Sequence, residues 1–193
     1  MLLERLLEQI IWNKQRKRFK YVGKGGHLGR ESKIVHPECI SIGDNFVAGR
    51  GIKLQVWKEF NGIKMRMEPE MVIGSNVAIM DRCQLSCAKA VYIGEGTLLG
   101  ENVFVTDNYH GKGEGEELKI PPHKRRLYVK GPVRIGKNVW IGRNVCIMPG
   151  VSIGDGVTIG ANAVVTKDIP EFSVAVGVPA KVVRQIDSEK RGG

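Results

Sequence analysis

The feature that most constrains this chain is a six-residue repeat that begins at Val133. From there the sequence reads VRIGKN-VWIGRN-VCIMPG-VSIGDG-VTIGAN-AVVTKD. Two sets of positions spaced by six are apolar throughout: the first is Ile135, Ile141, Ile147, Ile153, Ile159 and Val165, and the second, four residues after each of these, is Val139, Val145, Val151, Val157, Ala163 and Ile169. The first phase also occurs upstream, with interruptions, at Leu28, Ile34, Ile42, Ala48, Leu54, Ile73, Ile79, Leu85, Ile93, Leu99 and Val105.

A period of six fits neither an α-helix nor a strand with two alternating faces. It fits short strands that turn a corner every six residues, with one aliphatic side chain inward and Gly or Asn at the corner. Three corners, about 18 residues, would close one triangular coil, and stacked coils would bury a continuous aliphatic column. A β-sandwich is the alternative, but its strands would not keep one phase over six repeats. The repeat therefore predicts an all-β, solenoid-like fold.

Two segments abandon the repeat. Residues 55–70 contain two alternating arms around Asn61-Gly62, a pair that favours a type I′ hairpin. Residues 106–132 are rich in Gly, Pro and charge. A long excursion from a rigid scaffold is where function is expected.

The net charge of +10 comes from local segments. The excess of Lys and Arg lies in residues 1–24, 112–130 and 181–193, and the rest of the chain is neutral. No basic stripe with interleaved aromatic residues crosses the repeats, so nucleic acid is not expected as a partner. Cys83 and Cys87 form a lone C-x-x-x-C pair, which is weak support for zinc, and we expect reduced thiols and no metal.

Residues 1–24 are expected to form an amphipathic helix, followed by the repeat domain at 25–187 and a tail at 188–193. Charged residues interrupt the first apolar stretch, which makes it a poor secretory signal, so a cytoplasmic location is expected. The helix could contact the inner face of an anionic membrane through its basic, amphipathic character. Alternatively, Leu3, Leu6, Leu7 and Ile10 could cap the aliphatic column.

The segment 135–186, together with D-N-Y-H-G at 107–111, closely resembles the hexapeptide-repeat acyltransferases. Within that family the chain is similar to the galactoside, maltose and capsular-polysaccharide O-acetyltransferases over residues 25–187. The resemblance implies a left-handed parallel β-helix, a homotrimer, and acetyl-CoA bound in a groove between neighbouring helices. We expect the amphipathic segment at 1–24 to stand where the maltose enzymes have an N-terminal domain, and the long loop also departs from that group.

The resemblance makes His110 the expected general base. Acetyl transfer to a hydroxyl requires removal of its proton, and the pKa of histidine suits that task near neutral pH. Asp107 or a backbone carbonyl could fix the tautomer of His110. Among the other histidines, His123 could line the acceptor cleft or be a solvated loop residue.

The family pattern also implies residues for the two substrates. The positions that match the acetyl-CoA site are Trp140, Gly142, Ala161, Thr166, Lys167, Lys181 and Arg184, the three basic residues meeting the nucleotide end. Candidates for binding the acceptor are Asp81, Asp107 and Asn108.

The expected activity is transfer of acetyl from acetyl-CoA to a hydroxyl of a sugar or surface-polysaccharide precursor. An N-acetyltransferase for an amino sugar is the nearest alternative, because the same histidine could deprotonate an amine. A zinc hydratase and a catalytically silent scaffold of the same fold are alternatives from other classes.

Overall fold

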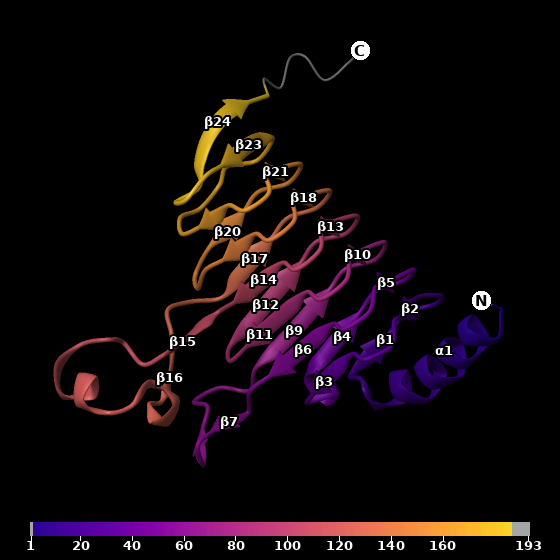
Figure 1. The fold of residues 1–193 in the computed structure, drawn as a ribbon, viewed down its shortest axis with the longest axis horizontal. Helices are drawn as coiled ribbons and strands as arrows, with labels where there is room; N and C mark the ends of the chain where they lie inside the picture. The colour runs from indigo at the N-terminus through magenta and orange to yellow at the C-terminus, as the bar shows by residue number, and fades with distance from the viewer. Residues whose placement is uncertain (1, 187–193) are drawn as a thin grey trace.

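The chain winds into a triangular coil of short strands with a helix packed at its N-terminal end (Figure 1). The computed structural model describes the backbone of residues 2–186 and the side chains of residues 8–186. The predicted tail at 188–193 lies outside the described residues. Strands from successive turns pair in register and in parallel, which builds three sheets.

Each sheet collects one side of the triangle. Sheet 1 contains β1 (Tyr21–Val22), β4 (Ile40–Ile42), β9 (Glu70–Ile73), β12 (Ala90–Ile93), β17 (Val133–Ile135) and β20 (Ser152–Ile153). Sheet 2 contains β2 (His27–Leu28), β5 (Val47–Ala48), β10 (Ala78–Ile79), β13 (Leu98–Leu99), β18 (Trp140–Ile141), β21 (Thr158–Ile159), β23 (Ser173–Val176) and the antiparallel β24 (Lys181–Gln185). Sheet 3 contains β3 (Lys33–Val35), β6 (Lys53–Val56), β11 (Gln84–Cys87), β14 (Phe104–Thr106), β19 (Cys146–Ile147) and β22 (Val164–Val165). This architecture confirms the predicted left-handed parallel β-helix.

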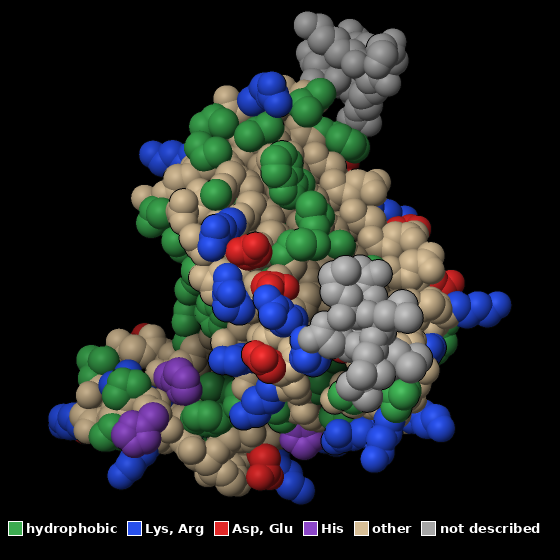
Figure 2. Space-filling view, turned by 45° about the vertical axis from the view of Figure 1, so that its right-hand side comes forward, with side chains coloured by type: hydrophobic (Ala, Val, Ile, Leu, Met, Phe, Trp, Pro, Cys, Tyr) green, Lys and Arg blue, Asp and Glu red, His purple; other side chains and the backbone are tan. Residues whose placement is uncertain are grey.

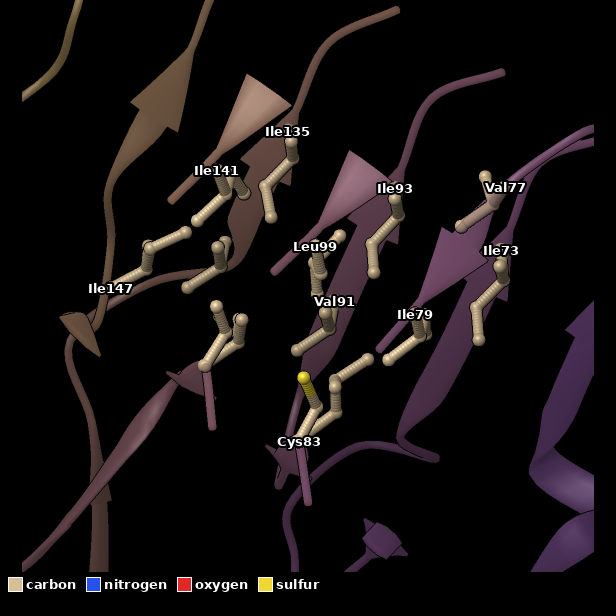
Figure 3. Packing of buried hydrophobic residues seen from close by; sticks show 14 of the residues in the cluster. Ile73, Val77, Ile79, Cys83, Val91, Ile93, Leu99, Ile135, Ile141 and Ile147 are labelled. Atoms are coloured by element: carbon tan, nitrogen blue, oxygen red, sulfur yellow. The ribbon is translucent and has the colours of Figure 1, made fainter. Parts of the chain in front are cut away.

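The aliphatic residues of the repeat fill the interior of the coil. Figure 3 shows Ile73, Ile93 and Ile135 from sheet 1 pointing toward residues of sheet 2 such as Ile79 and Ile141. Every predicted inward residue from Ile73 onward is buried. Upstream, Ile34 is only partly buried because β3 is the last strand of sheet 3 and has no strand beyond it. Hydrophobic burial along this column is the main stabilising term of the fold.

The corners use Asn and Gly as predicted. Asn102, Asn144 and Asn162 all have positive φ, between 58° and 61°. Their side-chain amides also stack: Asn102 donates to Asn144 at 2.9 Å, and Asn144 donates to Asn162 at 2.9 Å. At Gly136 the requirement is close approach, because a Cβ there would lie 2.4 Å from the Asp155 carboxylate.

The chain passes from sheet 1 to sheet 2 at corner 1–2, from sheet 2 to sheet 3 at corner 2–3, and from sheet 3 back to sheet 1 at corner 3–1. Every departure from the period of six falls on corner 3–1. The insertions are a 3₁₀ turn η2 (Pro37–Cys39), a hairpin excursion (residues 57–69), two extra residues after β11, and a long loop (residues 107–132). Insertions from four successive turns therefore gather along one edge of the helix.

Both predicted excursions are present. The hairpin excursion pairs β7 (Glu59–Phe60) with β8 (Ile63–Lys64), and Asn61 and Gly62 both have positive φ, as a type I′ turn requires. The long loop pairs β15 (Asn108–His110) with β16 (Leu127–Val129), and two 3₁₀ turns lie between them, η3 (Gly115–Lys119) and η4 (Pro122–Lys124). It projects from the body at the lower left of Figure 1.

At the other end, helix α1 (Leu2–Gln15) and the 3₁₀ turn η1 (Arg16–Arg18) cover the first coil. Trp12 is fully buried, with its ring 5.8 Å from that of Phe19 and 6.5 Å from that of Phe46. Glu8 pairs with Arg30 at 3.0 Å.

The helix therefore packs on the coil end, but the predicted contacts were partly wrong. Ile10 is 56% exposed, so it does not dock; Trp12 fills that role instead. The side chains of Leu3, Leu6 and Leu7 lie outside the described residues. Among the helices of residues 2–186, none has the length and hydropathy needed to cross a membrane.

Candidate active site

The long loop is anchored to corner 3–1 by Asp107. This side chain is fully buried, and its carboxylate accepts hydrogen bonds from the backbone N–H groups of Ala88, Lys89 and Ala90 at 2.7, 2.7 and 2.8 Å. The Asn108 side chain donates a further bond at 2.9 Å. Three N–H groups that the irregular corner leaves without strand partners are thereby satisfied.

This placement corrects two expectations for Asp107. Its oxygens are committed to the backbone of the preceding turn, so the carboxylate neither faces a substrate nor orients His110. Asp107 instead fixes the point at which the chain leaves the coil. Asn108 is half-buried and donates to Ser86 as well as to Asp107, which makes it part of the same anchor.

His110 is presented at the surface two residues beyond the anchor. Its backbone pairs with Leu127 across the two-stranded ribbon β15–β16, and its side chain is exposed. Neither ring nitrogen has a hydrogen-bond partner within residues 8–186, so both are available to a ligand. Figure 2 shows histidine side chains, in purple, on the projecting part at the lower left.

The rest of the long loop is held by its own polar contacts. The Lys112 N–H donates to the Glu117 carboxylate at 2.9 Å. Arg125 closes the loop from the other side, where its Nε donates to the Ile120 carbonyl at 2.7 Å. These bonds give residues 111–126 a defined shape without a core of their own.

Sequence reasoning missed the aromatic residues that lie beside His110. The ring of Phe60, in the hairpin excursion, lies 5.3 Å from the imidazole, and Trp57 lies 5.8 Å from Phe60. The phase of the repeat could have indicated this contact, because it places the start of both excursions after strands of sheet 3, at corner 3–1.

Asp81 lies elsewhere, on corner 2–3. Its carboxylate accepts the Arg50 N–H at 2.9 Å and lies 3.8 Å from the Arg50 guanidinium. Asp44 and Asp155 make the equivalent bond to the preceding turn on corner 1–2, so Asp81 serves the coil in the same way. The structure therefore does not bring the predicted acceptor residue Asp81 to His110.

Corner 2–3 also carries a ladder of ion pairs. Glu101 lies 3.5 Å from Arg82 and 3.3 Å from Arg143, on neighbouring turns. Figure 2 shows a face on which basic and acidic side chains alternate, with hydrophobic ones gathered toward the C-terminal end.

The residues predicted to bind acetyl-CoA fall into separate groups. Trp140 projects from the outer face of sheet 2 and is 56% exposed. Gly142 and Ala161 stack on corner 2–3, where a Cβ on Gly142 would lie 2.6 Å from the Ala161 nitrogen. Thr166 and Lys167 follow β22 and so lie on corner 3–1, the edge that carries His110.

The two basic residues of β24, Lys181 and Arg184, are exposed at the C-terminal end of sheet 2. Within one chain, sheet 3 separates the group on corner 2–3 from the group on corner 3–1. A single chain therefore does not bring all the predicted residues into one site.

Cys83 and Cys87 are buried free thiols. Cys83 donates to the Gly100 carbonyl at 3.0 Å, and Cys87 donates to the Glu70 carbonyl at 3.2 Å. Burial raises the pKa of Cys83 to about 11 and raises that of Cys87 further still. Within the part of the chain that the structure describes, no three His, Cys, Asp or Glu side chains cluster as metal ligands would.

Comparison with known proteins agrees with this geometry. A family profile described as "Bacterial transferase hexapeptide (six repeats)" matches residues 132–167. The chain is 36% identical over 173 residues to WbbJ of Escherichia coli (strain K12), named for O-acetyl transfer in lipopolysaccharide biosynthesis. That similarity covers 84% of this chain and 83% of WbbJ.

Solved structures show the same architecture. A maltose O-acetyltransferase from Clostridium difficile 630 is 29% identical, with a TM-score of 0.57 over 96% of this chain and 83% of its own. AntD, an N-acyltransferase from Bacillus cereus in complex with dTDP and 3-hydroxybutyryl-CoA, has a TM-score of 0.73 over 92% of this chain and 88% of its own. AntD is 22% identical, so it supports the fold alone. The repeat, the fold and the similarity to WbbJ together place this chain in the hexapeptide-repeat family of acyltransferases.

Proposed function

We propose that the protein is an acetyl-CoA-dependent O-acetyltransferase that acts on a hydroxyl of a sugar in a surface-polysaccharide precursor. The observation that carries the proposal is His110, which corner 3–1 presents to solvent with both ring nitrogens free of partners within residues 8–186. The similarity to WbbJ favours a hydroxyl acceptor, because that relative is named for O-acetyl transfer.

In the proposed reaction, His110 acts as a general base. One ring nitrogen takes the proton of the acceptor hydroxyl as its oxygen attacks the thioester carbonyl of acetyl-CoA. The imidazolium then returns that proton to the sulfur as the carbon–sulfur bond breaks, so the products are the acetyl ester and free CoA thiol. Neutral imidazole is restored at the end of the cycle, and the step balances without redox or metal chemistry.

The experiment that tests this activity is a panel of sugar acceptors with a thiol assay for released CoA. We expect thiol release that depends on an acceptor, and a product whose mass and base lability are those of an acetyl ester. A product whose acetyl group survives mild base, as an amide does, would instead establish N-acetylation of an amino sugar. Absence of acceptor-dependent thiol release across sugars and nucleotide-linked sugars would contradict the enzyme proposal.

The cofactor end of the proposed site rests on Lys167 and Arg184. Lys167 lies on corner 3–1 two strands beyond the exit of the long loop, about 10 Å along the coil axis at the usual strand spacing. Replacing Lys167 and Arg184 with alanine is expected to raise the KM for acetyl-CoA about 10-fold or more, with little change in the acceptor KM, since phosphate contacts contribute ground-state binding.

The matched control removes two lysines from corner 1–2. Lys24→Ala with Lys137→Ala makes the same change in net charge on exposed positions away from His110. Its KM for acetyl-CoA should stay near the wild-type value. An effect confined to the acceptor KM of the Lys167 and Arg184 variant would move the cofactor groove elsewhere.

We further propose a homotrimer in which corner 3–1 of one chain faces sheet 2 and corner 2–3 of its neighbour. The support is the separation of the predicted residues within one chain, together with the exposed Trp140 and Val47 in one register column of sheet 2. Such an arrangement would bring Trp140 of one copy near His110 of another.

Mixed oligomers test the shared site. His110→Ala and Trp140→Ala chains, each impaired at limiting acetyl-CoA, are co-refolded in equal amounts. If each site takes His110 from one chain and Trp140 from the next, random assembly should restore about one quarter of wild-type activity. Sedimentation should give the mass of three chains. Failure to regain activity from mixtures of proven trimers would contradict the shared site.

We also propose a cytoplasmic protein whose helix α1 contacts the inner face of the membrane. Ile10 and Ile11 are exposed, and the basic residues Lys14, Lys17 and Arg18 follow closely. Exposed apolar side chains beside basic ones favour binding to an anionic lipid surface. Trp12 packs on the coil, whereas Ile10 and Ile11 stay exposed on the surface of the helix.

A further inference from the structure

The hairpin excursion and the long loop are joined through one turn of the coil. They follow β6 and β14, and β11 lies between these two strands in sheet 3. The corner after β11 therefore lies between the two excursions. Ser86, the next-to-last residue of that strand, accepts the Trp57 indole N–H at 3.0 Å and an N–H of the Asn108 amide at 3.2 Å. One buried hydroxyl thus fixes the bases of both excursions.

The two excursions meet again farther from the coil. The rings of Trp57 and Phe60 pack edge to face, with centroids 5.8 Å apart and planes at 90°. Phe60 in turn packs against His110, with centroids 5.3 Å apart and planes at 61°. The Asn61 amide donates to the backbone carbonyl of His123 at 2.8 Å. The hairpin excursion therefore contacts the loop at two points that flank its η3 turn.

We propose that Phe60 is a positioning residue that holds the His110 ring in its working orientation. The proposal rests on the proposed function of His110 as general base. An exposed imidazole without hydrogen-bond partners would otherwise sample several rotamers. An edge-to-face ring contact favours one of them, and Trp57 and Ser86 connect Phe60 rigidly to the buried coil. The role of the hairpin excursion is therefore to orient the base.

Phe60→Leu tests this role because it keeps apolar volume and removes the ring. We expect kcat to fall about 10-fold or more, since small errors in the placement of a reacting group are costly. The KM for acetyl-CoA and the melting temperature should stay near wild type. Phe60→Tyr keeps the aromatic ring, so its kcat should stay close to the wild-type value. Ile63→Ala, at the position paired with Phe60 in the same hairpin, should leave kcat unchanged.

A double mutant separates positioning from direct contact with the acceptor. If Phe60 acts through His110, Phe60→Leu should cause no further loss of kcat in a His110→Ala background. Additive losses, or a Phe60→Leu effect confined to the acceptor KM, would overturn the proposal. Wild-type kcat in Phe60→Leu would overturn it as well.

A readout that needs no turnover keeps this inference distinguishable from the proposed function. The ring protons of His110 feel the ring current of Phe60, so their NMR shifts should move in Phe60→Leu and be preserved in Phe60→Tyr and Ile63→Ala. Unchanged shifts in Phe60→Leu would remove the contact on which the inference depends, even if acetyl transfer is demonstrated. Full activity of His110→Ala would instead contradict the proposed function.

Discussion

Replacing His110 with alanine is expected to lower kcat for acetyl transfer by about 10²–10⁴-fold, the usual contribution of a positioned general base. The physical reason is that the acceptor hydroxyl is barely ionised near neutral pH, so its proton must move to a base as the oxygen attacks. The measurement is the rate of CoA thiol release at saturating acetyl-CoA. The coil should be unaffected, because the imidazole contributes no hydrogen bond to the fold within residues 8–186.

His123→Ala is the matched control for this change. His123 lies in the same long loop and is exposed, and the loop uses its backbone carbonyl, which the substitution retains. Its kcat should stay close to wild type. A His110→Ala enzyme with near-normal turnover, or a His123→Ala enzyme with the larger loss, would contradict the assignment of the base.

The sequence predicted the interior of the fold well because one rule applies at every turn. Each short strand places an aliphatic side chain inward, and the next strand repeats that choice six residues later. Ile93 and Ile135 confirm this across a gap of 42 positions, because they pair directly in sheet 1 through β12 and β17. The insertion between them leaves the register intact.

The roles of Asp81 and Asp107 could not be predicted in the same way. An Asp at a corner can face solvent and a substrate, or it can turn back and accept N–H groups from the preceding turn. The choice depends on which backbone groups are left unpaired there, and this is set by contacts 17–31 residues away in the chain. A local sequence pattern contains no record of those pairings.

The contact between Phe60 and His110 could be predicted in part from the sequence. Counting turns from the repeat places both excursions on one corner and two strands apart, so their proximity follows from the sequence. The direction of the Phe60 ring does not, because it depends on how the hairpin excursion twists away from the coil. The bond from Trp57 to Ser86 sets that direction.

The largest expected effect on stability comes from Trp12. Trp12→Ala should lower the free energy of unfolding by about 3–5 kcal/mol, because it removes a fully buried ring and leaves a cavity between Phe19 and Phe46. For a chain of this size the melting temperature should fall by about 10 °C, measured by circular dichroism. Trp12→Phe should lose much less, since the indole Nε1 has no hydrogen-bond partner within residues 8–186.

Substitutions on the exposed side of the same helix test membrane binding without a change in stability. Ile10→Glu with Ile11→Glu changes two exposed residues, so the melting temperature should stay close to wild type. If α1 contacts the membrane, this variant should no longer sediment with vesicles rich in anionic lipid, whereas the wild-type protein should do so at low salt. Wild-type protein that never sediments with such vesicles would contradict the membrane proposal. In that case, a loss of stability in Trp12→Ala would show that the helix serves to cap the first coil.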